Sequence, residues 1–373
     1  MTTSDADDDL RAQFRQSVRQ VLKQASAARE AQPVWAPESA DELVIKQAAS
    51  LGWTGLLVEE RWGGAGAGMG EAIVVAEELG AHLTSMPFLS SAVLASTALS
   101  AGGSAAQQER WLPGLASGRL TGAAALTGPS GRTGLTDVTA VSERNGLVLR
   151  GESGFVLDGG AADVLLVAAC RAGEPDTELY IVESGSTGLE VTGLLSVDRT
   201  RRLSRVVLRD VRIAESARLP RGAAALEAML QRGSVALAAD AVGTARRALD
   251  MAVDYAKKRE QFGRPIGAFQ AIKHKLADMY LLVQGAALAV EGAAGAMDAG
   301  QDARRLVAVA ASYGRDAATK VTGDAIQVHG GIGYTWEHDC HRLFKRAKFD
   351  EAFLGDPSVN RERLAALVLG HDG

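Results

Sequence analysis

A proline-free run from Leu226 to Phe262 constrains the fold of this chain more than any other feature of its sequence. The run is rich in Ala, Leu, Arg and Lys, and as one α-helix it would extend roughly 50 Å. A helix of that length must pack along neighbours of similar length. Helical spacing resumes after it, so we expect further helices over 268–298 and 302–328 and a shorter pair after residue 336. These segments predict an antiparallel helix bundle.

The spacing of apolar residues divides the rest of the chain into a helical region and a β region. Residues 9–111 show helical spacing, whereas from about 120 to 215 short β-branched segments alternate with turn residues, among them "LVLRG", "DVLLVAAC", "ELYIVES" and "RVVLRDVRI". Asn145-Gly146 suits the tight turn of a β-hairpin. Because strands and helices do not alternate, we expect an antiparallel β region and not a doubly wound parallel sheet. The predicted class is α+β, with a helical domain at 1–118, a β domain at 119–222 and a helical bundle at 223–373.

The composition argues against several classes of protein. The hydrophobic fraction of 47% and the charged fraction of 23% are those of a globular protein, and a net charge of -5 provides no basic surface for nucleic acid. No apolar run approaches the roughly 18 residues of a membrane span, and the acidic start "MTTSDADDDLRAQFRQ" is unlike a secretory signal. We expect a cytoplasmic protein. Its cysteines, Cys170 and Cys340, are far apart and predict reduced structural thiols.

The long helix is predicted to break at Gly263, Pro265 and Gly267. A plain turn explains these three residues, because glycine permits unusual backbone angles and proline stops a helix. It does not explain why Arg259 and Phe262 lie three apart just before the break. A guanidinium and an aromatic ring beside exposed backbone can bind a phosphate-bearing heterocycle. The residues alone leave both interpretations open.

A second glycine cluster ends a later helix, in "QVHGGIGYTWE". Gly330, Gly331 and Gly333 have no side chains, so a ligand can approach the backbone, and Gln327 can hydrogen-bond it from the preceding turn. An earlier glycine run, "GGAGAGMG", fits no GxGxxG pattern and follows no Val- and Ile-rich strand. We interpret that run as a flexible connection between helices.

Several motifs carry a resemblance to the acyl-CoA dehydrogenase family of flavoproteins: "REQFGRPIGAFQAIKHKLADM", "QVHGGIGYTWE" and "RAKF", with "VEERWGGAGAG", "EELG" and "DRTRRLSRVVLRDVRI" earlier in the chain. The resemblance extends over nearly the whole sequence. It implies an N-terminal helical domain, a β-barrel-like middle domain, a C-terminal four-helix bundle and bound FAD. It also implies that Arg259, Phe262 and Gln270 hold the adenine and diphosphate end of FAD across a subunit interface, while Gln327 and Gly331 hold the diphosphate.

The middle domain keeps part of the family's flavin pattern. The loop Thr-Glu-Pro-Gly is matched by "LTGPSG", which keeps Thr127 and has Gly128 in place of the acid. Trp-Ile-Thr-Asn-Gly is matched by "FVLDG", which begins with Phe155 and has Leu157 where a threonine hydrogen-bonds near the flavin N5. The resemblance therefore implies FAD contacts from Thr127 and Phe155.

The resemblance implies α,β-desaturation of an acyl-CoA thioester, in which a base takes the α-proton, the flavin takes the β-hydride and an electron-transfer flavoprotein reoxidises the flavin. The commonest base is the glutamate of Tyr-Glu-Gly-Thr, and Leu354 stands at that position here. Other members carry the base just before an arginine that matches Arg232, where this chain has Gln231. Neither Leu354 nor Gln231 can ionise.

Three explanations account for the missing glutamate. Asp356 or Glu351 can act as a base from a shifted position, with Asp356 the better candidate, although Asp356 before Pro357 is more simply a helix N-cap. Alternatively, a second related chain supplies the base, as in actinobacterial family members that act on bulky CoA thioesters such as steroid side chains. The third explanation is a non-catalytic or repurposed relative, for example one that uses oxygen directly.

Other candidate residues have a functional and a structural interpretation. The resemblance places Arg232 near the thioester end of the substrate, but it can instead pair with Asp240 two helical turns along. His338 and His341 form H-x-x-H without the glutamate of H-E-x-x-H or an evident third ligand, so we interpret them as surface or interface histidines. The expected partners are acyl-CoA, an electron-transfer flavoprotein, and either further copies of this chain or a related second subunit.

Overall fold

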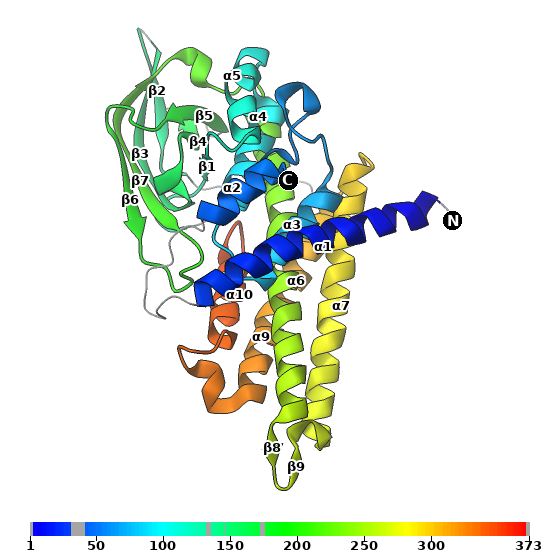
Figure 1. Ribbon diagram of the computed structural model, residues 1–373. Coiled ribbons are helices and arrows are strands. Elements are labelled where there is room, and N and C mark those ends of the chain that lie inside the picture. The colour runs from blue at the N-terminus through cyan, green and yellow to red at the C-terminus, as the bar shows by residue number, and fades with distance from the viewer. Residues whose placement is uncertain (1–2, 31–41, 132–135, 145, 172–175, 371–373) are drawn as a thin grey trace. The chain divides into compact units, whose positions relative to one another are not determined.

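The computed structural model describes residues 3–30, 42–131, 136–144, 146–171 and 176–370, and it contains two compact units (Figure 1). One unit comprises Met1–Glu38, Met69–Thr84 and Ser234–Gly373, and the other comprises Ser39–Gly68 and Ser85–Gly233. We call them the helical unit and the sheet unit. The long helix α6 (Gly222–Lys258) begins in the sheet unit and continues in the helical unit. The three domain ranges proposed from the sequence stay a prediction.

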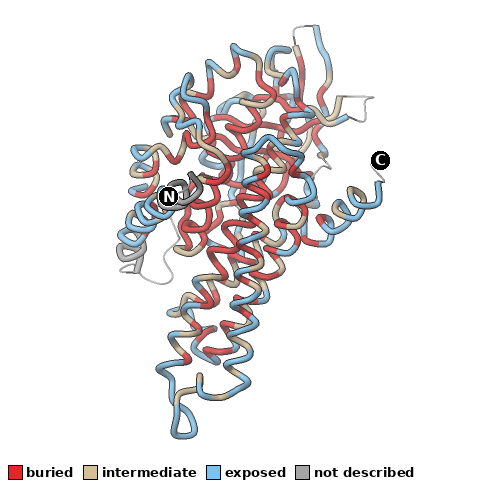
Figure 2. The backbone as a smooth tube through the Cα atoms, turned by 90° about the vertical axis from the view of Figure 1, so that its right-hand side faces the viewer, coloured by how far each residue is buried: buried red, intermediate tan, exposed pale blue. Residues whose placement is uncertain are grey.

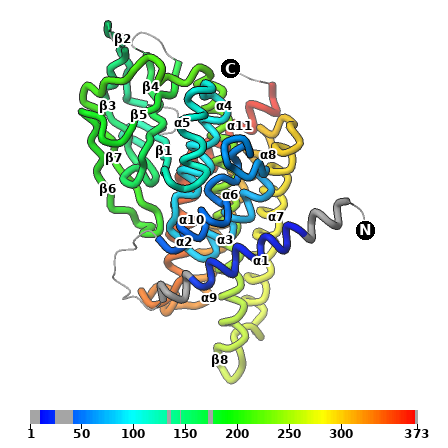
Figure 3. Tube along the Cα trace, turned by 45° about the horizontal axis from the view of Figure 1, so that its top comes forward, coloured from blue at the N-terminus to red at the C-terminus, as the bar shows by residue number. Residues whose placement is uncertain are grey.

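The helical unit contains the predicted bundle. Besides α6, its elements are α1 (Thr3–Glu30), α3 (Met69–Ala81), β8 (Glu260–Gln261), β9 (Arg264–Pro265), α7 (Gln270–Asp298), α8 (Arg304–Val309), α9 (Arg315–His329), α10 (Cys340–Ala352) and α11 (Pro357–Leu369). Helix α7 packs against α3, α8 and α9, α9 packs against α10, and α11 lies beside α8 (Figure 3). The bundle and its long helices are confirmed.

The predicted helix at 302–328 is present, but one stretch of it is π-helical. Helix α8 continues through Ala310–Gly314, which is π-helical, into α9 with α-region backbone angles at both junctions. Within that segment the Ser312 hydroxyl donates to the Ala308 carbonyl oxygen at 2.7 Å. Such bonds from a side chain to the helix backbone compete with the regular ladder and favour a local bulge. The spacing of apolar residues in the sequence does not reveal that one turn of the helix contains an extra residue.

Small residues bring the helices of this unit into close contact. A Cβ atom added at Gly243 of α6 would lie 1.8 Å from the carbonyl oxygen of Glu77 in α3, so the two backbones touch there. Arg346 of α10 donates to both carboxylate oxygens of Asp240 in α6, at 2.9 and 2.7 Å, and both side chains are buried. This bidentate pair ties α10 to α6 inside the core.

The sheet unit contains one seven-stranded sheet with helices beside it. Its longer helices are α2 (Glu42–Ser50), the π-helical η3 (Phe88–Ala95), which continues into α4 (Ser96–Gly102), and α5 (Ala105–Ala116). Its strands are β1 (Gly122–Ala125), β2 (Thr139–Glu143), β3 (Gly146–Leu157), β4 (Val164–Arg171), β5 (Thr177–Glu183), β6 (Leu189–Leu194) and β7 (Leu203–Ile213). The strand order is β1-β4-β2-β3-β7-β6, with β5 paired to β4. The chain therefore has the α+β fold that the sequence predicted.

The sheet is mixed, which corrects the prediction of an antiparallel region. Strands β1 and β2 both pair in parallel with β4. The sequence did not reveal β1, because its residues "GAAA" are small and unbranched, nor the exposed strand β6. The hairpin between β2 and β3 is present, with Glu143 opposite Gly146. Asn145 in its turn lies outside the described residues.

One helix of the described residues is long and apolar enough to cross a membrane. In α7 an 18-residue window has a mean hydropathy of 1.3, and 44% of that window is buried. The expectation that no segment approaches a membrane span overlooked this helix, because isolated polar residues interrupt every continuous apolar run. A core helix of a globular unit meets the same criterion, so length and composition are weak evidence here.

Candidate functional site

The predicted helix break is the exposed tip of the α6–α7 hairpin, at the bottom of Figure 2. Gln261 pairs with Arg264, which leaves Phe262 and Gly263 as a two-residue turn with φ of 52° and 76°. Positive φ at both positions is typical of a type I′ turn and explains Gly263. It is unfavourable for a bulky aromatic residue, yet the Phe262 ring is 92% exposed. The turn therefore leaves Phe262 largely exposed, with the Phe269 ring at its edge.

The side chains around this tip fit a phosphate-bearing aromatic ligand. Arg259 follows the last residue of α6, and its exposed guanidinium forms no ion pair within the described residues. The Arg264 guanidinium lies 4.2 Å above the Phe269 ring, which meets Phe262 edge to face at 6.1 Å between centroids. Gln270, the first residue of α7, is exposed. The sequence interpretation missed Arg264, although it lies between two of the residues that were singled out.

The second glycine cluster forms the 3-10 turn η8 (Gly330–Tyr334), directly after α9. Gly330 ends the helix with a φ of 66°, and a Cβ atom added at Gly330 or Gly331 would meet no atom within 4 Å. The Gln327 side chain on the last turn of α9 is exposed. Open backbone lets a ligand such as the diphosphate of FAD approach closely, and the exposed Gln327 amide can donate a hydrogen bond to it. The individual FAD contacts stay predictions.

In the sheet unit, Thr127 and Phe155 lie on neighbouring segments. The buried Thr127 hydroxyl donates to the Gly154 carbonyl oxygen at 2.5 Å, so its oxygen keeps only acceptor capacity for a flavin. Phe155 has a φ of 54°, and a Cβ atom at Gly131 would lie 3.1 Å from its ring. Leu157 is buried and can offer no hydrogen bond. The aromatic position is therefore kept, whereas the hydrogen bond near the flavin N5 is not.

The loop matched to the family's glutamate motif has an unusual backbone. Leu354 is buried and has a φ of 59°. Two residues on, the Asp356 carboxylate caps α11, accepting from the backbone N–H groups of Ser358 at 2.7 Å and Val359 at 3.0 Å. Glu351 pairs with Lys348 one turn earlier in α10. The capping role of Asp356 is confirmed, and its role as a base stays a prediction.

A buried arginine that the sequence interpretation missed holds this loop. Nη1 of Arg315 in α9 donates to the carbonyl oxygens of Asp350, Phe353 and Gly355, at 3.2, 2.8 and 3.0 Å. Burial lowers the pKa of Arg315 to about 10, while the nearby Asp350 charge acts in the opposite direction. A guanidinium that satisfies three carbonyl groups fixes the end of α10 and the loop with Leu354. In the sequence, the only indication that Arg315 is buried is that a charged residue stands within an apolar helix face.

The other family position for a base also lacks an acid. The Gln231 amide donates to Glu227 one turn earlier in α6, at 3.0 Å, and the neighbouring Arg232 is half-buried. Asp240, the alternative partner considered for Arg232, accepts two hydrogen bonds from Arg346. The substrate role of Arg232 stays a prediction.

Comparisons with known proteins show the family of this chain. The family model "Acyl-CoA dehydrogenase, N-terminal domain" matches residues 5–119, and "Acyl-CoA dehydrogenase, C-terminal domain" matches residues 220–369. An "Acyl-CoA dehydrogenase" of Bacillus subtilis (strain 168) is 33% identical over 357 residues, which cover 89% of this chain and 92% of that protein.

Two solved structures share the fold over nearly its full length. The ChsE4-ChsE5 complex from Mycobacterium tuberculosis has a TM-score of 0.88 and 28% identity, covering 99% of this chain and 98% of that one. The structure reported for the electron transferring flavoprotein of Acidaminococcus fermentans has a TM-score of 0.88 and 26% identity, covering 95% and 98%. This chain belongs to the acyl-CoA dehydrogenase family, whose members are FAD-dependent oxidoreductases.

Proposed function

We propose that this chain takes part in the α,β-dehydrogenation of an acyl-CoA thioester and passes the electrons to an electron-transfer flavoprotein. Family membership supports the reaction class, and the likeness to the Acidaminococcus structure supports the acceptor. FAD, when bound, supplies the two-electron oxidant. The residues proposed to hold FAD are Arg259, Phe262, Gln270, Gln327, Gly331, Thr127 and Phe155, with Arg232 near the substrate thioester.

One observation favours a second candidate, a partner subunit whose related second chain supplies the base. The loop matched to the family's base motif has Leu354, which is buried and has a positive φ, in place of the acid. The two nearby carboxylates considered as alternative bases already have other partners, since Asp356 caps a helix and Glu351 forms an ion pair. Removal of an α-proton needs a positioned base, which contributes roughly 10²–10⁴-fold. The ChsE4-ChsE5 structure, a complex of two chains, is consistent with such a pairing.

Anaerobic absorbance spectroscopy of the purified single chain distinguishes the two candidates. The flavin band is recorded before and after a panel of acyl-CoAs of different size. Bleaching by any of them would show that this chain contains its own base and would refute the partner proposal. A flavin band that persists with the single chain, but bleaches when the chain is purified together with a related second chain, would support that proposal.

The cofactor assignment at the hairpin tip has its own test. Arg259→Ala is expected to lower the flavin content after purification, because the variant loses a cation at the adenine and diphosphate end. Lys257→Ala is a matched control, since it removes an exposed cation from the last turn of the same helix. Equal flavin content in wild type and Arg259→Ala would refute the assignment.

A further inference from the structure

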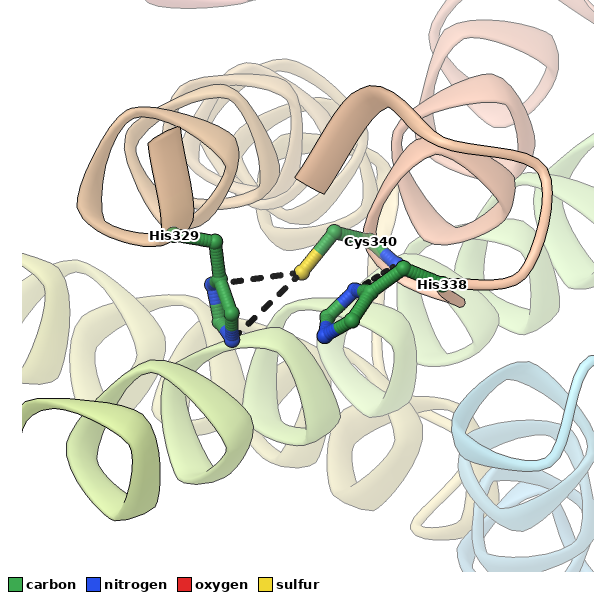
Figure 4. A group of neighbouring side chains, drawn as sticks. All are labelled: His329, His338 and Cys340. Atoms are coloured by element: carbon green, nitrogen blue, oxygen red, sulfur yellow. Dashed lines mark hydrogen bonds between the residues drawn. The ribbon is translucent and has the colours of Figure 1, made fainter. Parts of the chain in front are cut away.

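Three potential metal ligands meet where α9 ends and α10 begins: His329, His338 and Cys340 (Figure 4). The Cys340 sulfur lies between the two imidazole rings, and one ligand atom from each residue lies within 4.8 Å of the others. His341, the second histidine of H-x-x-H, does not join them, because its ring packs edge-on against Trp336 at 5.2 Å. The ligand that the sequence analysis did not find is therefore His329, which lies before the η8 turn, whereas His338 and Cys340 lie after it.

The hydrogen bonds of His329 prepare it as a ligand. Its Nδ1 lies 2.8 Å from the Ala325 carbonyl oxygen, which can only accept, so Nδ1 carries the proton. This tautomer leaves a lone pair on Nε2, which lies 4.0 Å from the Cys340 sulfur, while the sulfur is 3.4 Å from Nδ1. Histidines that bind metals commonly donate their other N–H to a backbone carbonyl in this way. Tetrahedral zinc bonds of about 2.0 Å to nitrogen and 2.3 Å to sulfur span an edge of about 3.5 Å. The present 4.0 Å between Nε2 and the sulfur needs a side-chain adjustment of roughly half an ångström to reach that edge.

The three-residue cluster is buried at His329 and Cys340 and partly accessible at His338. His329 and Cys340 are buried, and the Tyr255 ring of α6 stacks on His329 at 4.6 Å between centroids. His338 is only half-buried, so an ion and a water can enter from its side. Its Nδ1 accepts from the Cys340 backbone N–H over a long 3.3 Å, a weak bond that can be exchanged for a metal ligand.

We propose that His329, His338 and Cys340 bind one divalent ion of the zinc class, with water in the fourth position. Two imidazoles and one thiolate are a ligand set that suits zinc and cobalt(II) and disfavours magnesium or calcium. Binding transfers the Cys340 thiol proton to solvent. The ion links the end of α9 to the start of α10 across the turn that contains Gly331, and so stabilises that turn. No electron transfer is involved.

Metal analysis tests the site directly. The purified flavoprotein is incubated with Zn²⁺, dialysed and assayed for zinc per chain by atomic emission. We expect about one zinc per chain in the wild type and a loss of most of that zinc in Cys340→Ser and His338→Gln, because each variant removes one of the three protein ligands. Cys170→Ser and His341→Gln are matched controls, since they remove the chain's other cysteine and the other histidine of H-x-x-H; both should retain zinc.

Cobalt supplies a second readout that identifies the ligand. A difference spectrum between Co²⁺-loaded and metal-free protein should show a thiolate-to-cobalt charge-transfer band in the near ultraviolet, present in Cys170→Ser and missing in Cys340→Ser. If Cys340→Ser does not fold, the half-buried His338→Gln variant decides from its zinc content. Wild-type protein without bound zinc, or His338→Gln with an unchanged zinc content, would overturn the proposal.

Discussion

Asp356 has two proposed roles, and substitution can separate them. If the carboxylate only caps α11, Asp356→Asn should leave the stability of α11 unchanged. Asparagine ranks with aspartate as an N-cap and accepts hydrogen bonds from the same backbone N–H groups. Asp356→Ala should loosen the first turn of α11, because the cap bonds of 2.7 and 3.0 Å are lost. The expected cost is about 0.5–2 kcal/mol.

That cost predicts a local effect of definite size. In hydrogen exchange, an opening free energy lower by about 0.5–2 kcal/mol accelerates the α11 amides by roughly 2- to 30-fold. Mass spectrometry of a peptide that spans α11 (Pro357–Leu369) measures this rate, with a peptide from α7 as the internal reference. Asp356→Ala should exchange faster in α11 only, and Asp356→Asn should match the wild type.

The same two variants test catalysis in whichever assembly bleaches the flavin with acyl-CoA. As a cap alone, Asp356 can become asparagine without loss of the flavin reduction rate. A base would lose roughly 10²–10⁴-fold in that variant, because asparagine cannot take a proton. Such a loss in Asp356→Asn, with unchanged exchange in α11, would refute the explanation that Asp356 acts as a cap alone and would identify it as the base.

Three further predictions concern stability. Gly243→Ala should destabilise the protein by about 1–3 kcal/mol or more, because its Cβ would lie 1.8 Å from a carbonyl oxygen of α3. Gly292→Ala, with open space around it in α7, should instead stabilise the protein by roughly 0.5–1 kcal/mol. Denaturant unfolding measures both changes in the free energy of unfolding. Arg346→Met leaves its buried aspartate partner uncompensated at a cost of about 3–5 kcal/mol in the same assay. Burial alone would raise the pKa of Glu78, but the hydrogen bond and charge of Arg19 outweigh it and lower the pKa below its usual 4.5. The stability gap between wild type and Arg19→Gln should therefore be complete above about pH 4.5 and close as the pH falls through the lowered pKa; a gap that is constant between pH 7 and pH 3 would contradict this.

Local sequence patterns predicted the turns and the helix cap around the candidate site. The glycines of the hairpin tip and of the η8 turn appear in the sequence because backbone angles act on one or two residues at a time. The loss of the glutamate at Leu354 is likewise visible without a structure. The pattern Asp356-Pro357 correctly predicted a helix cap, since an N-cap involves only the next three residues.

The sequence alone determined the α+β class, the long helices and the residues that depart from the family's flavin and base patterns, because these follow from periodicity and from motifs of adjacent residues. Only the tertiary structure decided that Arg315 holds the loop around Leu354, and that Cys340 lies between His329 and His338. These contacts join residues on different helices or on opposite sides of a turn. Their geometry depends on how the helices pack, which the spacing within one helix does not specify.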